Sequence, residues 1–372
     1  MELLQALRIT LVVLLSMSLT ACSLPRGAAL SSEILKEKAS EDPTFSVVPV
    51  SRSNIAQLAK WPVTGWSGHY RWLKGGRGPN SPVIRAGDVL NLVIWDSQEN
   101  SLLAPATQKL VNMPNLVVSS AGTIFIPYLN KVSVVGKTPD QARSIIQESI
   151  ISIAASAQVQ LSVKPGKQNS ADLVTGVAKP GTYPLPDRNY TILSLLANGG
   201  GITPTMRNPL VRLIRNGKTY ETPADALFSD ASKNILIRGN DKVLVQEDKR
   251  YFTALGATGS ERIVYFDKEN ITAIEALSMI GGLSDARADL KGILILRDYA
   301  ARALRKDGKG PEMQQVIFVF DLTSADGLFA ARSFQINPND TVLATESAVT
   351  NARTILGLIG ASLGIANTLA SN

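Results

Sequence analysis

Two stretches of the chain share one layout, and this internal repeat constrains the fold more than any other feature. Thr191–Ile202 and Thr272–Leu283 each begin with threonine, continue with apolar residues at helical spacing and end in a Gly-Gly pair. Threonine is a favourable N-cap, and glycine supplies the left-handed turn that closes a helix. The sequence therefore predicts two short helices in equivalent positions of two similar domains.

The segments around these helices also match in order. A β-rich approach precedes each helix, Leu173–Leu185 in one copy and Phe252–Phe266 in the other. Each copy then closes with two similar segments, which are Asn234–Ile237 and Asn240–Val243 in the first and Ser333–Ile336 and Asn339–Val342 in the second. We therefore expect two repeats of one domain, residues 170–247 and 250–344.

The second copy carries an extra basic segment around Arg297–Pro311. It has two interpretations, a solvated hairpin tip or a contact with an acidic glycan or a partner protein.

A third unit precedes the repeats. Val89–Trp95 is strongly β-prone, and Gln158–Val163 alternates as a closing strand. Two further strands, Leu116–Ser119 and Thr123–Pro127, are joined by a turn at Ala121-Gly122. We expect residues 81–165 to form a compact α+β unit.

The helix of this unit has a clear start. Thr138 can cap it, Pro139 occupies the first helical position, and Gln141 completes a capping box. Its predicted buried stripe consists of Ala142, Ile145, Ile146, Ser149 and Ile153.

The chain contains one cysteine, Cys22, directly after a short apolar run, Ile9–Leu19. The run is too short to span a membrane and is typical of a secretory signal. Leu19-Thr20-Ala21-Cys22 resembles a bacterial lipobox, in which the thiol is lipidated and the chain is cut before it. We predict a signal peptide at residues 1–21 and lipidation of Cys22; the other interpretation is plain secretion with a chance cysteine. By resemblance to the usual sorting rule, Ser23 favours the outer membrane.

Composition excludes several classes of function. The net charge of +7 is spread along the chain, whereas nucleic-acid binding needs a clustered basic surface; an acidic glycan or lipid head group would suit it better. Once Cys22 is lipidated, no thiol remains for zinc or nucleophilic chemistry. His69 is the only histidine, and its turn-rich aromatic surroundings favour a packing role. We predict no catalytic residue, metal or cofactor.

The C-terminal segment is amphipathic and almost uncharged. Thr354–Asn372 has no charged residue. On a helical wheel, one face is aliphatic and carries Ala352, Ile355, Leu356, Ile359, Leu363, Ala366 and Ala370. A helix from Thr345 to Ser371 would be about 40 Å long, enough for a bilayer core of about 30 Å. We predict that residues 345–372 form an outer-membrane helix.

A single helix cannot enclose a pore, but eight copies could form an α-barrel with their small and hydroxylated faces inward. The predicted pore-lining residues are Thr350, Thr354, Gly357, Ala361, Gly364 and Thr368. Other interpretations are a helix that packs on its own domain or lies on a membrane surface, since small residues at this spacing also suit helix–helix packing.

These features resemble a known family. Ser81–Val163 is similar to the polysaccharide export domain, in its Gly87-Asp88-Val89 entry and in the stretches "AGTIFIP", "GKTPDQA" and "QVQLSV", although Ala121-Gly122 replaces the commoner Asp-Gly. Gly176–Leu185, "GVAKPGTYPL", resembles the opening of a soluble-ligand-binding β-grasp (SLBB) domain, and Thr272–Leu283 marks a second. The second copy has Ala257–Arg262 in place of the "KPG" element. The chain is identified as a member of the Wza-type outer-membrane polysaccharide export lipoproteins.

The resemblance implies a multidomain α+β protein and a homo-oligomer, an octameric ring, mostly in the periplasm and anchored to outer-membrane lipid. A leg, residues 22–80, would run along the outside and lend strands to both repeats. The lumen would carry capsular or exopolysaccharide from an inner-membrane copolymerase, often a tyrosine kinase, to the cell surface, with no reaction catalysed.

Two other functions stay open at this point. One is a periplasmic glycan-binding or scaffold lipoprotein without its own channel. The other is a glycan-processing enzyme, which would need two carboxylates converging in a cleft.

Overall fold

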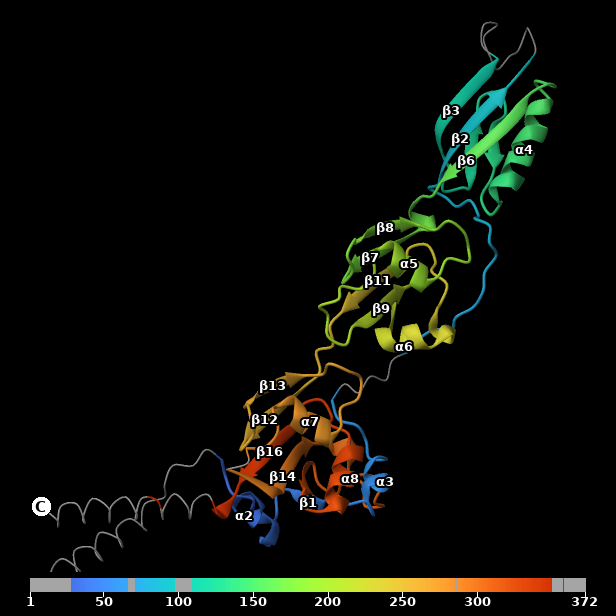
Figure 1. Cartoon of the computed structure of the whole chain (residues 1–372). Helices are drawn as coiled ribbons and strands as arrows, with labels where there is room; N and C mark the ends of the chain where they lie inside the picture. The colour runs from blue at the N-terminus through green and yellow to red at the C-terminus, as the bar shows by residue number, and fades with distance from the viewer. Residues whose placement is uncertain (1–27, 66–70, 98–108, 285–286, 350–356, 358–372) are drawn as a thin grey trace, which may run out of the picture. The chain divides into compact units, whose positions relative to one another are not determined.

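The computed structural model describes residues 28–65, 71–97, 109–284, 287–349 and 357 (Figure 1). The chain divides into two compact units. One contains residues 68–248, and the other combines residues 1–67 with residues 249–372. Each unit is described by itself.

The first part of unit 68–248 is a small α+β domain. It contains an antiparallel sheet in the order β3-β2-β6, a hairpin β4–β5 and one helix, α4. The bounds are β2 (Val89–Trp95), β3 (Leu110–Val117), β4 (Thr123–Ile126), β5 (Asn130–Ser133), α4 (Pro139–Ile151) and β6 (Gln158–Lys164). This confirms an α+β unit here and adds β5, which the sequence pattern did not predict.

Helix α4 begins as predicted. Gln141 N–H donates to the Thr138 side chain at 3.3 Å, and the Thr138 N–H donates to Gln141 Oε1 at 3.0 Å, which completes the capping box. The buried stripe is Ala142, Ile146 and Ile150, which pack with alternate residues of β2. Ile145 is partly buried and packs against the same core, but the prediction was wrong for Ser149, which is only partly buried, and for Ile153, which lies beyond the end of the helix. A strict four-residue spacing, 142, 146 and 150, decides which side chains face the sheet.

The rest of this unit is the first repeat, a five-stranded sheet in the order β10-β9-β11-β7-β8. Its strands are β7 (Ser170–Thr175), β8 (Gly181–Pro184), β9 (Leu210–Arg215), β10 (Lys218–Pro223) and β11 (Lys242–Gln246). Its helices are η2 (Lys167–Asn169), α5 (Ile192–Asn198), α6 (Ala224–Ser229) and η3 (Ala231–Lys233). Helix α5 contributes Ile192, Leu195 and Leu196 to the core beside the sheet (Figure 1).

The second repeat lies in the other unit and has the same strand order, β15-β14-β16-β12-β13, with β1 added beside β15. Its strands are β1 (Ser46–Pro49), β12 (Tyr251–Gly256), β13 (Arg262–Tyr265), β14 (Ala288–Asp298), β15 (Gln315–Phe320) and β16 (Thr341–Glu346). Its helices are α2 (Ser31–Ile34), η1 (Leu35–Ala39), α3 (Ile55–Leu58), α7 (Ala273–Met279), η4 (Ala301–Ala303) and α8 (Ala325–Ser333). The two repeats therefore share one strand order, as expected for duplicated domains.

The two repeat helices start and end as predicted. Thr191 caps α5 and Thr272 caps α7, the latter with Glu275 in a capping box. The glycine pairs after them have positive φ, from +77° to +81°. A side chain is strained in this conformation, so glycine is the residue that the turn requires.

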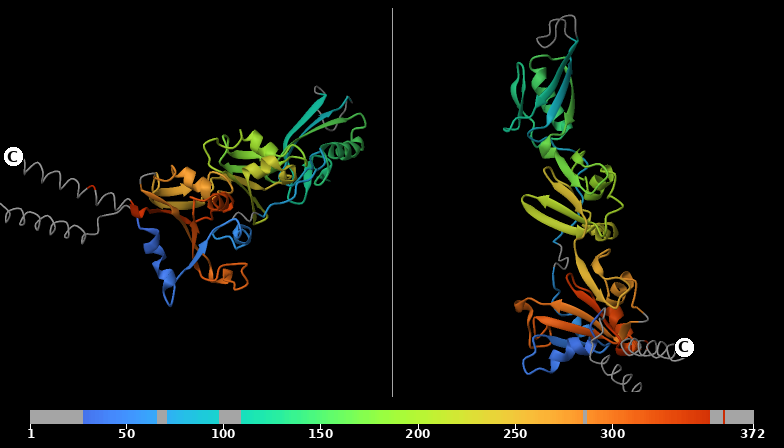
Figure 2. Two further views of the ribbon diagram at one scale, coloured as in Figure 1. Left: turned by 60° about the horizontal axis from the view of Figure 1, so that its bottom comes forward. Right: turned by 90° about the vertical axis from the view of Figure 1, so that its left-hand side faces the viewer.

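The N-terminal leg contacts the same edge strand of each repeat. Strand β1 pairs in parallel with β15, from Ser46 beside Val316 to Pro49 beside Val319 (Figure 2, blue segment). Beside the first repeat, the Arg71 carbonyl accepts from the N–H of Glu221 in β10 at 3.0 Å. The leg residues 71–80 contain no strand, so the expectation that the leg lends a strand to both repeats was wrong for the first.

Candidate functional site

The N-terminal leg and the end of the last strand meet in the second unit. The N–H of Glu346, the last residue of β16, donates to the carbonyl of Ala29 at 3.0 Å, and Leu30 forms a parallel bridge with Glu346. Arg287 joins the same point, because its carbonyl accepts from the Ser347 N–H at 2.7 Å. Residues 29–30 and 346–347 therefore lie side by side in this unit.

A buried carboxylate sits where the two segments meet. The Glu346 side chain is 6% exposed, and its Oε1 accepts from Arg287 Nε at 3.2 Å. Its Oε2 is buried without a hydrogen-bond partner among the described residues. Because a buried charge is costly unless it is paired, Arg287 is what allows Glu346 to lie here.

This geometry corrects the start of the predicted C-terminal helix. Thr345 and Glu346 belong to β16, so a helix from Thr345 was wrong; residues 348 and 349 are helical. Strand pairing between β14 and β16 holds this part of the chain extended. Cys22 lies seven residues before Ala29, a stretch that spans at most about 25 Å.

Most of the predicted site residues lie outside the described residues. These are Cys22, Thr350, Thr354, Ala361, Gly364 and Thr368, together with His69. Gly357 is described and is helical and exposed. Within the described ranges, no helix combines the length and the apolar character needed to cross a membrane.

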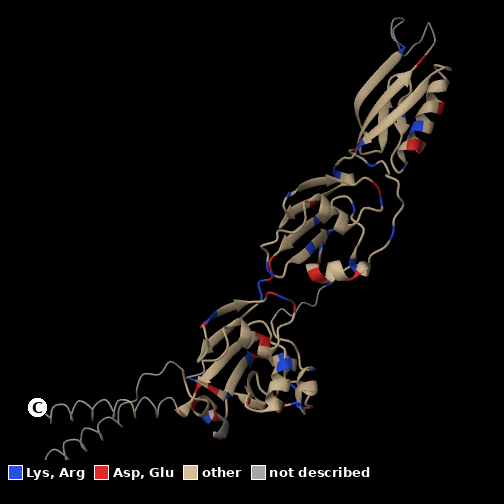
Figure 3. Cartoon of the chain, in the orientation of Figure 1, with Lys and Arg blue, Asp and Glu red and all other residues tan. Residues whose placement is uncertain are grey.

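Charged residues are spread over both units (Figure 3). Among the described residues, no three His, Cys, Asp or Glu side chains are grouped so that they could hold a metal ion.

The extra basic segment of the second repeat is held by the leg. Gln57 Nε2 and Trp61 Nε1 both donate to the carbonyl of Gly308, at 2.8 and 3.1 Å. Arg297 at its start is buried, but later charged side chains such as Arg302 and Arg305 remain exposed. The segment is therefore a clamped, solvated loop rather than a free hairpin tip.

Comparison with known proteins places this domain order in a family. Residues 77–164 match the family model of polysaccharide biosynthesis/export proteins, and residues 173–245 match the SLBB domain model. The capsule polysaccharide export protein BexD of Haemophilus influenzae is 26% identical over 93% of this chain and 93% of its own length. The chain thus contains a polysaccharide export domain followed by an SLBB domain, and it is similar to capsule polysaccharide export proteins over most of its length.

Other relatives share this description. The capsule polysaccharide export outer membrane protein CtrA of Neisseria meningitidis serogroup A is 25% identical over 74% of this chain and 75% of its own length. The EPS I polysaccharide export outer membrane protein EpsA of Ralstonia nicotianae is 28% identical over 74% of each chain. These relatives are named as export proteins and not as enzymes.

Proposed function

We propose that this chain is a subunit of an outer-membrane translocon that carries capsular or exopolysaccharide from the periplasm to the cell surface. The observation that carries the proposal is the order of an export domain and an SLBB domain along a chain whose relatives, aligned over most of their length, are named as polysaccharide exporters.

The contact between residues 29–30 and residue 346 supports a membrane-anchored arrangement. In the proposal, Cys22 carries acyl chains and the residues after Ser347 form an amphipathic outer-membrane helix. Because Ala29 is hydrogen-bonded to Glu346, both anchors would enter the membrane at one face of the second repeat. Acyl chains that each contribute about 0.8 kcal/mol per buried CH₂ would hold that face at the bilayer.

The pore would need several copies of the chain. One amphipathic helix leaves its polar face toward lipid, whereas a ring of eight copies would turn Thr350, Thr354, Gly357, Ala361, Gly364 and Thr368 toward a wet lumen. An inner-membrane copolymerase, often a tyrosine kinase in such systems, would deliver the polysaccharide to the periplasmic side.

The proposal is tested in the bacterium that encodes the chain. Deletion of its gene should abolish surface polysaccharide and retain polymer inside the cell, and the wild-type gene should restore export. Cys22→Ala should remove labelling by radioactive palmitate and reduce surface polymer. Unchanged surface polysaccharide in the deletion strain would overturn the proposal.

A second measurement separates a channel from a periplasmic scaffold. Protein purified in mild detergent should form rings with a central channel in electron micrographs, and a C-terminal tag should be accessible on intact cells. A monomer whose tag is inaccessible would instead support a glycan-binding or scaffold lipoprotein.

A further inference from the structure

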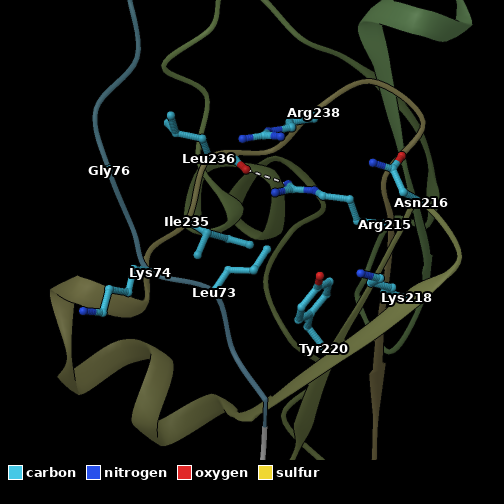
Figure 4. A pocket seen from close by; sticks show the side chains of 10 residues that line it. All are labelled: Leu73, Lys74, Gly76, Arg215, Asn216, Lys218, Tyr220, Ile235, Leu236 and Arg238. Atoms are coloured by element: carbon cyan, nitrogen blue, oxygen red, sulfur yellow. Dashed lines mark hydrogen bonds between the residues drawn. The ribbon is translucent and has the colours of Figure 1, made fainter.

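The first repeat contains an open, cationic cavity of about 450 Å³, which we call the basic pocket. Its walls come from three segments, namely leg residues 73–76, the β9–β10 hairpin and residues 235–238 (Figure 4). The lining residues used below are Leu73, Arg215, Lys218, Tyr220, Ile235 and Arg238. Its volume is within the usual range of small-molecule sites, about 300 to 1,000 Å³.

The leg wall of the basic pocket is fixed in place. Trp72 Nε1 donates to the Lys233 carbonyl at 2.8 Å, and the Gly75 N–H donates to the Ser232 carbonyl at 2.6 Å. A Cβ at Gly75 would lie 2.8 Å from the carbonyl oxygens of both Ser232 and Asn234. The cavity is therefore a built feature of the repeat, not a gap beside a loose segment.

The lining is positively charged and has no acidic residue. Arg215 is held by Asp241, which neutralises it. By contrast, no ion pair joins Lys218, Arg238 or Lys74 to any residue that the structure describes. Figure 4 shows Arg238 above Arg215 and Lys218 below it. Unpaired cations gathered around a cavity attract an anion.

The floor of the basic pocket is apolar. Ile235 is 1% exposed, and Leu73 and Tyr220 pack against the core of the repeat. The carbonyl of Leu236 at the same wall already accepts from Arg215 Nη2 at 2.7 Å. A ligand for this site therefore needs a flat apolar face as well as negative charge.

The second repeat shows that the fold does not require the cations of this pocket. Equivalent residues follow from the strand register. Lys218 faces Arg215 in β9 as Val316 faces Arg297 in β14, so Lys218 corresponds to Val316. Tyr220 faces Leu213 as Phe318 faces Ile295, so Tyr220 corresponds to Phe318. Arg238 likewise corresponds to Asn337, since each backbone N–H donates to the aspartate three residues later.

In the second repeat, aromatic side chains pack around the arginine that is equivalent to Arg215. The Arg297 guanidinium lies over the Phe318 and Phe334 rings, 5.2 and 5.1 Å from their centroids, and Trp61 of the leg packs against Phe318 at 5.9 Å. The second repeat thus has valine and asparagine where the first has Lys218 and Arg238, and its own cavity beside the leg, of about 340 Å³, is lined by other residues.

We propose that the basic pocket binds an acidic sugar residue of the exported polysaccharide, with its carboxylate toward Lys218 and Arg238 and an apolar face of its ring on Tyr220. The inference rests on the proposed function, and it adds that the substrate is an anionic glycan. A sugar acid offers both features that the site requires, whereas inorganic phosphate has no apolar face and an acidic peptide has no rigid flat ring.

The test is calorimetric titration of the full chain in mild detergent with trigalacturonic acid. The matched ligand is its methyl ester, which keeps the sugar rings and removes the charge. Trigalacturonic acid should bind at least ten times more tightly than the ester, and its affinity should fall with added salt. Equal binding of the two ligands overturns the proposal without any mutation.

Variants then locate the site. The double variant Lys218→Gln/Arg238→Gln should weaken trigalacturonate binding at least tenfold, because it removes both proposed carboxylate contacts. Lys131→Gln/Arg143→Gln removes two exposed charges from β5 and α4 and lowers the net charge equally, and it should bind like wild type. Equal losses in the two variants would mean that only overall charge matters, which overturns the site.

Two further ligands test the chemical class. Inorganic phosphate and tri-glutamate should bind far more weakly than trigalacturonate, and equal affinity for either would overturn the sugar assignment. Because the titration needs no export, a negative titration would refute binding at the basic pocket and leave the translocon proposal unaffected. A deletion strain that keeps its surface polysaccharide would instead refute the translocon proposal.

Discussion

Arg297 donates to both carboxylate oxygens of Asp340 inside the second repeat, with Nε 2.9 Å from Oδ1 and Nη2 2.7 Å from Oδ2. The side chains are 7% and 1% exposed. Arg215 and Asp241 have the same relationship in the first repeat. The duplication therefore extends to a buried ion pair between the strand β9 or β14 and the turn before β11 or β16.

The pair also ties strand β14 to the residues just before β16. Besides its carboxylate contacts, Arg297 Nη2 donates to the Gln335 carbonyl at 2.9 Å, and the Asn337 N–H donates to Asp340 Oδ2 at 2.8 Å. Burial by itself lowers the pKa of Arg297, but the bonded Asp340 carboxylate outweighs it and raises that pKa above its ordinary value. The guanidinium is therefore charged at every pH of interest.

Breaking this pair should be among the most destabilising single changes in the chain. Asp340→Asn leaves the Arg297 charge buried without its counter-ion, and we expect a loss of about 3–5 kcal/mol in the free energy of unfolding. Urea unfolding followed by circular dichroism measures it. Asp326→Asn, which breaks the exposed pair with Arg52, is the control and should cost less than about 1 kcal/mol. Similar losses in the two variants would contradict the prediction.

Gly256 is expected to tolerate no side chain. Its φ is +89°, and a Cβ there would lie 2.2 Å from the carbonyl oxygen of Ala344 in the paired strand β16. Gly256→Ala should therefore cost at least about 2 kcal/mol, from backbone strain and from separation of the strands.

Gly201 provides the matched control for this prediction. It has a similar φ of +79°, but no atom lies within 4 Å of its Cβ position. Gly201→Ala should cost about 1 kcal/mol from backbone strain alone. If thermal or urea unfolding gives equal losses for the two variants, the close approach to Ala344 does not matter.

Trp61 should hold the extra loop of the second repeat. Its ring packs against Phe318 and Tyr299, at 5.9 and 6.1 Å between centroids, and its Nε1 donates to Gly308. Trp61→Phe keeps a ring and loses the hydrogen bond, so we expect a loss of about 1 kcal/mol and faster tryptic cleavage in residues 299–314.

The first repeat supplies the control for the loop. Trp72 makes a similar hydrogen bond, from Nε1 to the Lys233 carbonyl. Trp72→Phe should leave the rate of cleavage in residues 299–314 unchanged, as mass spectrometry of the digest would show. Acceleration by both variants would point to general destabilisation, not to the Gly308 contact.

The sequence predicted the features that a few neighbouring residues determine. Each of these features involves residues within about one helical turn of each other, so their spacing in the sequence was sufficient to predict them. They are Thr138 with Gln141, Thr272 with Glu275, and the glycine pairs after α5 and α7. The order of the export unit and the repeats followed from the same local signals.

Contacts between distant segments were not predictable in this way. Arg215 and Asp241 are 26 residues apart, but Arg297 and Asp340 are 43 apart, because the extra loop changes the spacing between two equivalent pairs. The basic pocket likewise combines three segments that no single motif connects. Thr345 was assigned to a helix because its neighbours fit a helical period, whereas pairing with β14 keeps it in a strand.

The last prediction concerns acid stability at the start of α7. Hydrogen bonds from Lys268 and from the Thr272 N–H lower the pKa of Glu275 from 4.5 to about 2. A carboxylate with a lowered pKa stabilises the fold above pH 4.5, and that contribution disappears as the pH falls toward 2. Because Glu275 is largely exposed, we expect it to be worth at most about 1 kcal/mol.

Glu275→Gln removes the charge and retains an oxygen that can accept from Thr272. Wild type should be more stable than the variant at pH 6, and the difference between their free energies of unfolding should shrink steadily as the pH falls from 4.5 to 2.5. Other groups that titrate in acid affect both proteins equally, so the difference isolates Glu275. A difference that stays constant between pH 6 and pH 2.5 would show that the charge of Glu275 contributes nothing and that the carboxyl acts only as a neutral cap.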